Sequence, residues 1–195
     1  MKRTERIIGI IAFASIILNL NLVPLGSTLS VISLSCLSVL YMYLGSAIFC
    51  GVPLQKVFIK ESYAGYSNRR KSVNVMIGMI ISATLVGILF KLQGWPNASF
   101  LLQIGSGGLL ISALIYFIKV RDKNPAIYSN VINRIAIVAM FAFIFMLTPK
   151  EKLLEFKYRN HPEYVKAVKK AWADPDNQAL WKKVAEESLK IYKEK

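Results

Sequence analysis

The sequence has little of the chemistry that most catalytic and metal sites need. Among 195 residues there are two cysteines, Cys36 and Cys50, and one histidine, His161. Two cysteines in one apolar run are too few for a disulfide framework and lack metal-site spacing. We therefore predict that both cysteines pack as small residues and that His161 belongs to a helix start. With no phosphate loop or Cys/His cluster either, we expect no enzyme, no cofactor and no metal.

Acidic residues are also scarce, at 11 against 25 lysines and arginines, which gives a net charge of +14. Such an excess is typical of proteins that bind nucleic acid. Outside the last fifth of the chain, however, the basic residues sit mostly at the ends of long apolar runs, where they fix helix ends in a membrane. We therefore expect a lipid bilayer as the environment and no nucleic-acid partner.

Long apolar runs are abundant, since 54% of the residues are hydrophobic and only 18% are charged. Several runs approach the roughly 20 residues that cross a bilayer as a helix. The chain is therefore predicted to be an all-α, polytopic helical membrane protein. Arg134 interrupts the fifth run, and we expect its side chain to snorkel to the headgroups; an interfacial helix is the alternative there. The five predicted spans are 7–23, 28–49, 73–92, 100–118 and 131–148.

Turn residues and charges divide the chain into five parts. Basic connections alternate with neutral ones, which places the N-terminus in the cytoplasm and the tail in the periplasm of a bacterial inner membrane. The apolar start lacks a cleavage site and is predicted to be retained. The five parts are a first transmembrane hairpin (1–50), a basic cytoplasmic loop (51–72), a second hairpin (73–120), a loop with the fifth helix (121–148) and an amphipathic helical tail (149–195).

The two hairpins look like copies of one another. A shift of 72 residues sets Pro24 on Pro96 and Ser27 on Ser99, so that both reversals read Pro-x-small-Ser. Apolar matches are common between membrane helices, and the shared reversal is therefore the informative part. We predict a parallel repeat of two hairpins.

Small residues in the spans indicate close contacts between helices. Gly78 and Ser82 are spaced by four in the third span, and Gly105, Gly107 and Gly108 cluster in the fourth. Small residues at this spacing let two backbones approach in a membrane. The alternative for the glycine cluster is a helix break that lines a cavity.

Beyond Pro149 the apolar residues recur at helical spacing among many charges. One helix is expected to start at Pro162, and a second to use Asp174 as its cap. Trp172 and Trp181 would join the two helices and form a docking element for a partner.

Residues 87–105 read GILFKLQGWPNASFLLQIG. This stretch resembles the membrane hairpin of the L subunit of the gliding-motility and type 9 secretion motor. The resemblance covers about forty residues and implies a helical hairpin. Its turn also has the residues of an interface anchor, because Lys91 would reach headgroup phosphates, Trp95 suits the interface, and Pro96 opens the returning helix.

The sequence departs from the motor pattern at two positions. The family has a membrane glutamate where residues 105–110 read GSGGLL, and a histidine where Gly94 stands. The resemblance therefore implies the hairpin rather than proton coupling. We predict a non-enzymatic membrane subunit, a structural or accessory part of an assembly, that self-associates or binds other membrane subunits. The alternatives are a small channel or carrier, or a motor-related protein without the proton-carrying carboxylate.

Overall fold

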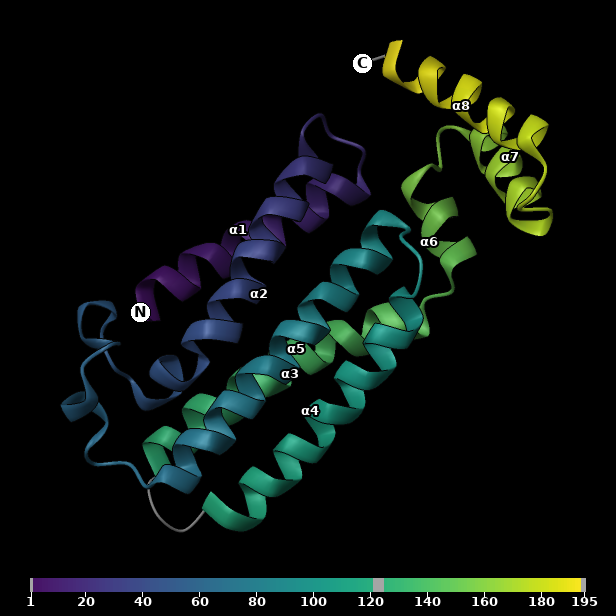
Figure 1. The fold of residues 1–195 in the computed structure, drawn as a ribbon. Coiled ribbons are helices and arrows are strands. Elements are labelled where there is room, and N and C mark those ends of the chain that lie inside the picture. The colour runs from purple at the N-terminus through teal and green to yellow at the C-terminus, as the bar shows by residue number, and fades with distance from the viewer. Residues whose placement is uncertain (1, 121–124, 194–195) are drawn as a thin grey trace.

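The computed structural model describes residues 2–120 and 125–193, and the described residues form helices, turns and irregular segments (Figure 1). Two 3-10 turns, η1 (Leu54–Lys56) and η2 (Lys60–Tyr63), lie between α2 and α3. The helices in chain order are α1 (Lys2–Leu20), α2 (Gly26–Cys50), α3 (Asn68–Gln93), α4 (Ala98–Val120), α5 (Pro125–Leu147), α6 (Lys150–Lys157), α7 (Pro162–Ala173) and α8 (Gln178–Lys193).

Three helices are long and apolar enough to cross a membrane, namely α2, α3 and α4. A fourth candidate combines 131–147 of α5 with α6, although the two parts are bent by 94°. The first helix is not among the candidates, because charged residues occupy most of its first turn and leave only 7–20 uninterrupted. The chain is thus helical and suited to a bilayer, while the number of five spans stays a prediction.

The tail differs from its predicted layout at two places. A separate helix, α6, directly follows the bend after α5 and was not predicted. The second tail helix begins at Gln178, and the predicted cap at Asp174 is wrong. Asn177 acts instead, accepting a hydrogen bond from the Ala179 backbone N–H at 3.2 Å. Pro162 does begin α7 as expected.

The turns after α1 and α3 have the same backbone conformation. Leu22 and Gly94 have positive φ angles of 54° and 71°, and Leu25 and Asn97 follow at 64° and 60°. Leu22 and Gly94 each donate their N–H three residues back, and the residue after each of them donates five back, as in a Schellman motif. All these positions differ by 72 residues, the offset that relates the two reversals in the sequence.

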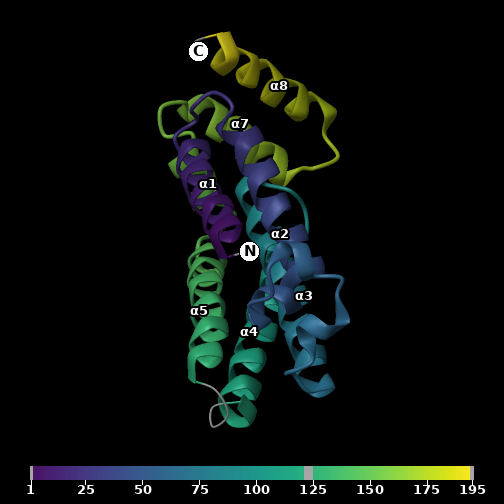
Figure 2. The same cartoon turned by 90° about the vertical axis from the view of Figure 1, so that its left-hand side faces the viewer.

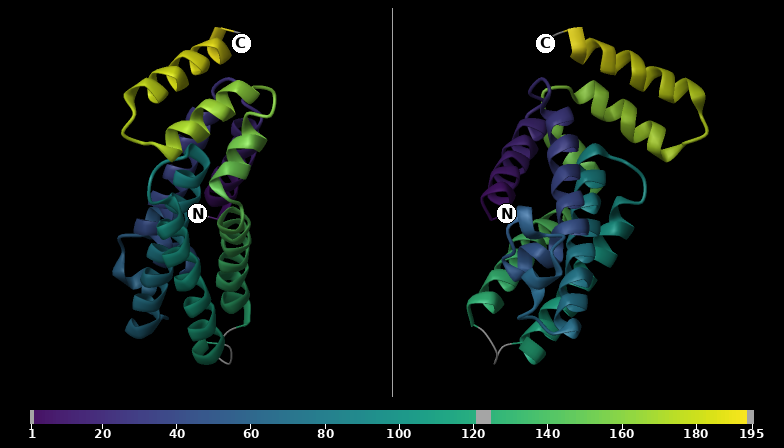
Figure 3. Two further views of the ribbon diagram at one scale, coloured as in Figure 1. Left: turned by 90° about the vertical axis from the view of Figure 1, so that its right-hand side faces the viewer. Right: turned by 60° about the vertical axis from the view of Figure 1, so that its left-hand side comes forward.

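Both turns lie at one end of the bundle, which we call the turn end (residues 21–25 and 94–97). Ser27 Oγ donates to Gln93 Oε1 at 2.9 Å and so joins the two turns. The tail lies at the same end, since Lys157 Nζ donates to the Leu92 carbonyl at 3.5 Å and Arg159 Nη2 to Asn21 Oδ1 at 3.1 Å. Figure 3 shows α7 and α8 as a pair of helices across this end.

Helix α2 is held between α1 and α3 by short polar contacts. The Ser15 and Ser33 hydroxyls lie 2.9 Å apart across α1 and α2, and Ser38 and Ser82 lie 2.7 Å apart across α2 and α3. Asn19 adds a hydrogen bond of 2.7 Å to a further α2 serine. These serines therefore face protein, as expected of hydroxyls in apolar helices.

The first helix is displaced along the bundle relative to α5. Figure 2 shows α1 above α5, with the N-terminus near the middle of the molecule's height. The start of α1 thus lies against the bundle, far from the end where α5 begins. This displacement creates the buried site described next.

Candidate functional site

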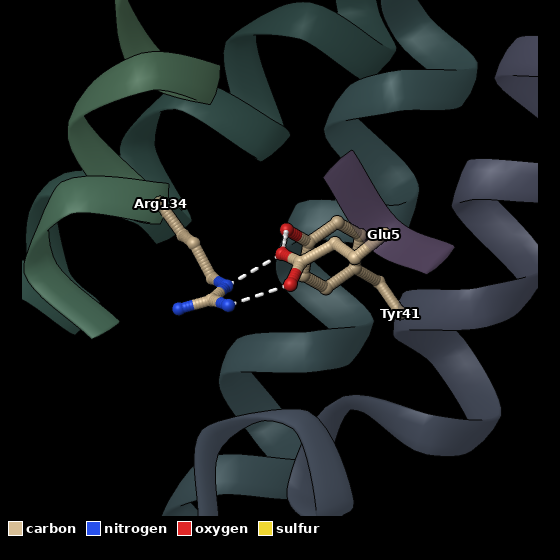
Figure 4. Close-up of polar contacts among 3 residues, drawn as sticks. All are labelled: Glu5, Tyr41 and Arg134. Carbon is tan, nitrogen blue, oxygen red and sulfur yellow. Dashed lines mark hydrogen bonds and ion pairs between the residues drawn. The ribbon is translucent and has the colours of Figure 1, made fainter. Parts of the chain in front are cut away.

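Three polar side chains from different helices meet inside the bundle (Figure 4). Arg134 on α5 donates from Nε to Glu5 Oε1 at 2.5 Å and from Nη2 to Glu5 Oε2 at 2.5 Å. Tyr41 on α2 donates its hydroxyl to Glu5 Oε1. The carboxylate of α1 is thus bound by both other helices.

This cluster is largely closed to the surroundings. The side chains of Arg134 and Glu5 are 13% and 9% exposed, and Tyr41 is 4% exposed. A buried charge is tolerated when it is paired and hydrogen-bonded, and the two-point arginine–carboxylate geometry satisfies both charges. The expectation that Arg134 snorkels to the headgroups is therefore wrong, because an acidic partner lies within reach inside the bundle.

An apolar cavity of about 380 Å³ extends from this cluster between α1, α2, α3 and α5. Its polar end contains Glu5, Arg6, Tyr41, Asn133 and Arg134. Phe13 and Phe141 touch edge to face at 5.8 Å on its walls. The remaining lining is apolar and includes Ala12, Ile16, Leu34, Leu37, Leu85, Ile88, Ile137 and Val138.

Sequence patterns alone do not single out Glu5 as a site residue. It is the only acidic residue among the first 60 and stands between Arg3 and Arg6, so that it looks like part of a charged helix start. The sequence does have one carboxylate beside an apolar run and one arginine, Arg134, inside another run. Ionisable groups of opposite charge tend to pair within a membrane, so these two residues are candidates for an ion pair. Their 129-residue separation gave no indication of contact.

A second cavity, here called the tail cavity, lies at the turn end between the α3–α4 turn and helices α6, α7 and α8. It measures about 560 Å³, within the usual range for small-molecule sites. Its lining combines lysines, aromatic rings and apolar side chains, as in Lys91, Lys150, Lys157, Trp95, Tyr158, Tyr164, Trp172, Trp181, Leu153, Leu154 and Val168.

The three predicted anchor residues line this tail cavity. Lys91 is only 7% exposed, so it lines the tail cavity and does not extend from a free helix end, and its contact with headgroup phosphates stays a prediction. Helix α6, which was not predicted, covers that side of the turn. Trp95 remains 44% exposed and touches Phe90 edge to face at 5.0 Å, while Pro96 lies in the turn before α4.

The two tail tryptophans make separate contacts. The Lys150 ammonium lies 4.5 Å from the ring centroid of Trp172, and Trp181 Nε1 donates to the Pro175 carbonyl at 2.8 Å. Both rings line the tail cavity, and Trp181 is 41% exposed. Helices α7 and α8 pack against each other, so the tail forms a compact pair.

Four of the five predicted small packing residues lie at helix crossings. A Cβ built on Gly78 would lie 2.5 Å from the Tyr41 carbonyl, and one on Gly105 would lie 2.5 Å from Thr84 Oγ1. Gly108 faces Ile80 in the same way, and Ser82 bonds to α2. Gly107 differs, because its Cβ would meet nothing within 4 Å. Helix α4 continues through this cluster, so the alternative of a helix break does not apply.

The two cysteines have different surroundings. Cys50 is buried, with Asn74 Nδ2 donating to its sulfur at 3.4 Å and Tyr66 donating to its carbonyl at 2.7 Å. Cys36 is exposed on α2, so the expectation that it packs inside the protein is wrong. Among the described residues, no group of three metal-ligating side chains occurs.

Helices α6 and α7 are joined outside the apolar spans by an ion pair. Lys169 Nζ lies 2.5 Å from Glu155 Oε1, and Lys152 lies 3.5 Å from the other oxygen. The hydrogen bond from Lys169 is the main cause of a lowered pKa for Glu155. This pair helps to set the angle between α6 and α7.

The basic connection predicted between the fourth and fifth spans includes residues 119, 121 and 123, whose side chains lie outside the described part of the chain. Comparison with family models, with curated proteins and with solved structures finds no match to this sequence. The resemblance of residues 87–105 to a motor subunit therefore stays a prediction.

Proposed function

We propose that the chain is a non-enzymatic integral membrane subunit that associates with another membrane helix and presents its tail to a partner. In this proposal two hairpins and α5 form the membrane part. The outward face of α4 is the contact for the neighbouring helix. The proposal is supported chiefly by one unbonded polar residue on that face, Gln103.

Helix α4 is the most open of the three apolar helices. Only 28% of its apolar stretch is buried, against 50% for α2 and 56% for α3. Its exposed residues recur at spacings of four and three, the pattern of helices that pack side by side. The stripe consists of the exposed Phe100, Ile104, Ile111, Leu114 and Ile118, with the half-buried Gly107 at the position between Ile104 and Ile111.

Two members of this face favour a protein neighbour over lipid alone. Gln103 is exposed in the second turn of α4, and its amide makes no hydrogen bond to the residues that the structure describes. An amide that faces hydrocarbon is stabilised by a polar group from a second helix. Gly107 lies one turn further along, and its open side would let that helix approach closely.

The way in which the tail is attached to the bundle supports its proposed role of presenting α7 and α8 to a partner. Only Thr148 and Pro149 separate α5 from α6, and the tail bonds to both turns through Lys157 and Arg159. A partner would therefore meet α7 and α8 in one fixed position. With an odd number of spans this end would be periplasmic.

Substitution of Gly107 tests the helix contact. Gly107→Leu should abolish co-purification of a companion membrane protein or a second copy at fixed stoichiometry in mild detergent. The chain should stay folded, because nothing lies within 4 Å of a Cβ built at this position. Ile10→Phe adds bulk to an exposed position on α1, away from α4 and 68% exposed, and should retain the complex. A wild-type protein that runs as a lone monomer in several mild detergents would contradict the proposal.

Cysteine labelling in whole cells tests the sidedness. Lys60 lies in the segment between α2 and α3, and Lys182 lies on α8; both are exposed. In a background with Cys36→Ala and Cys50→Ala, an impermeant thiol reagent should label Lys182→Cys from outside and spare Lys60→Cys. Protection of both positions would place the tail in the cytoplasm.

A further inference from the structure

The tail cavity has a strongly one-sided charge. Lys91, Lys150 and Lys157 line it, and no aspartate or glutamate does so among the described residues. The nearest acidic influence on Lys91 is Glu151, which faces it from α6 and attracts it through space, while Lys150 repels it. Glu151 also lies 3.9 Å from Lys150, so it offsets part of the charge of a lining that is otherwise basic.

Lys91 is the most enclosed of the three lysines. It is 7% exposed, and its ammonium makes no hydrogen bond or ion pair with any residue that the structure describes. The stem of Lys91 is enclosed by protein, whereas its nitrogen is not among the fully buried atoms without a partner and so opens onto the cavity that it lines. A partly desolvated ammonium in that position attracts an anion. The two further lysines around the same cavity favour an anion.

The start of α4 adds to this preference. Asn97, Ala98 and Ser99 line the cavity and form the beginning of a helix of 23 residues. The first backbone N–H groups of a helix have no partner within it, and the helix dipole places partial positive charge there. Helix starts bind phosphate groups for this reason.

The surroundings of the cavity suit a lipid rather than a free ion. Trp95 and Phe100 are 44% and 61% exposed beside it, at the end of two apolar helices. Tryptophan is typical of the level where headgroups and acyl chains meet. Apolar lining from Leu153, Leu154 and Val168 provides contacts that inorganic phosphate cannot use.

We propose that the tail cavity binds the phosphate headgroup of one anionic lipid, with Lys91 as its central contact. The headgroup phosphodiester lies between Lys91 and the start of α4, and Lys150 and Lys157 contribute further charge. Basic pockets at helix ends recognise anionic headgroups in this way. The bound lipid also joins the tail to the α3–α4 turn.

Tryptophan fluorescence reports on this cavity directly. The chain has three tryptophans, and all three line the cavity. Brominated phosphatidylglycerol should quench the purified full chain in micelles at a concentration about tenfold or more below brominated phosphatidylcholine, because a charge-assisted contact to the phosphate adds to the affinity. Lys91→Met should remove this difference. Lys60→Met, at an exposed position far from the cavity, should keep it.

Two further measurements make the test decisive. Lys150 has a side chain 61% exposed, so Lys150→Met leaves the packing intact and should weaken binding of phosphatidylglycerol if Lys91→Met fails to fold. Inorganic phosphate alone should leave the emission unchanged and should not displace the lipid. Equal quenching by both lipids, no effect of either substitution, or saturable binding of inorganic phosphate in place of the lipid would overturn the proposal.

Discussion

Glu5 and Arg134 are 129 residues apart in the sequence and form a two-point ion pair inside the helix bundle. The pair joins the first helix to α5, and Tyr41 of α2 bonds to the same carboxylate. One acidic side chain thus holds together three helices that otherwise enclose an apolar cavity. Substitution of Glu5 should therefore destabilise the packing of all three helices.

Glu5→Gln should destabilise the protein by about 3 to 5 kcal/mol, because it leaves the Arg134 guanidinium buried without a counter-charge. The double variant Glu5→Leu/Arg134→Met should recover most of this loss, since a well-packed apolar pair replaces both charges. Unfolding in mixed micelles with increasing SDS measures the difference. Additive losses in the double variant would show that the two side chains do not depend on each other.

Leu25→Asn should stabilise the first turn by about 1 kcal/mol, because Leu25 has a φ of 64° that β-carbon contacts disfavour. Asparagine tolerates this conformation and occupies the equivalent position 97 in the second turn. Leu25→Ala is the matched control. Alanine also lacks the apolar side chain but retains the backbone strain, so thermal stability should rise for asparagine only.

Gly78→Ala and Gly107→Ala should have opposite effects on stability. The new Cβ at position 78 would lie 2.5 Å from a backbone carbonyl of α2, and separating the helices should cost about 1 to 3 kcal/mol. At position 107 nothing lies within 4 Å, and alanine should stabilise the helix by about 0.5 to 1 kcal/mol. Thermal unfolding of the monomer in detergent compares them, and a shared sign would contradict the assignment of the crossing.

The contact between α6 and α7 should weaken in acid. Because Lys169 lowers the pKa of Glu155, the ion pair stabilises the folded tail fully above the ordinary glutamate pKa and is lost as the pH falls through the lowered value. Emission of Trp172, as the sole tryptophan after Trp95→Phe and Trp181→Phe, should be constant near neutrality and shift below about pH 4.

Two substitutions serve as references for this titration. Glu155→Gln should abolish the shift in acid. Glu163→Gln should preserve it, because Glu163 pairs with Lys166 within α7 and does not join two helices. An acid response that survives in Glu155→Gln would assign the effect to another carboxyl group.

Much of the local structure was predictable from sequence patterns. Apolar runs without charges indicate α2, α3 and α4, because an uninterrupted apolar helix closes its own backbone hydrogen bonds in lipid. Pro24 and Pro96 mark the two reversals, and the 72-residue offset coincides with turns of equal backbone conformation. Such features depend on neighbours along the chain.

The chemistry of the sites was decided by tertiary structure. The sequence by itself determined that the chain is helical and apolar, with a charged tail. Only the packing of the bundle brings Glu5 to Arg134, and only the fold of the tail brings α6 to the cavity that Lys91 lines. The Glu5–Arg134 ion pair and the burial of Lys91 both depend on contacts between segments far apart in the chain. The local periodicity of the sequence does not indicate which of the many charged residues will be buried by such contacts.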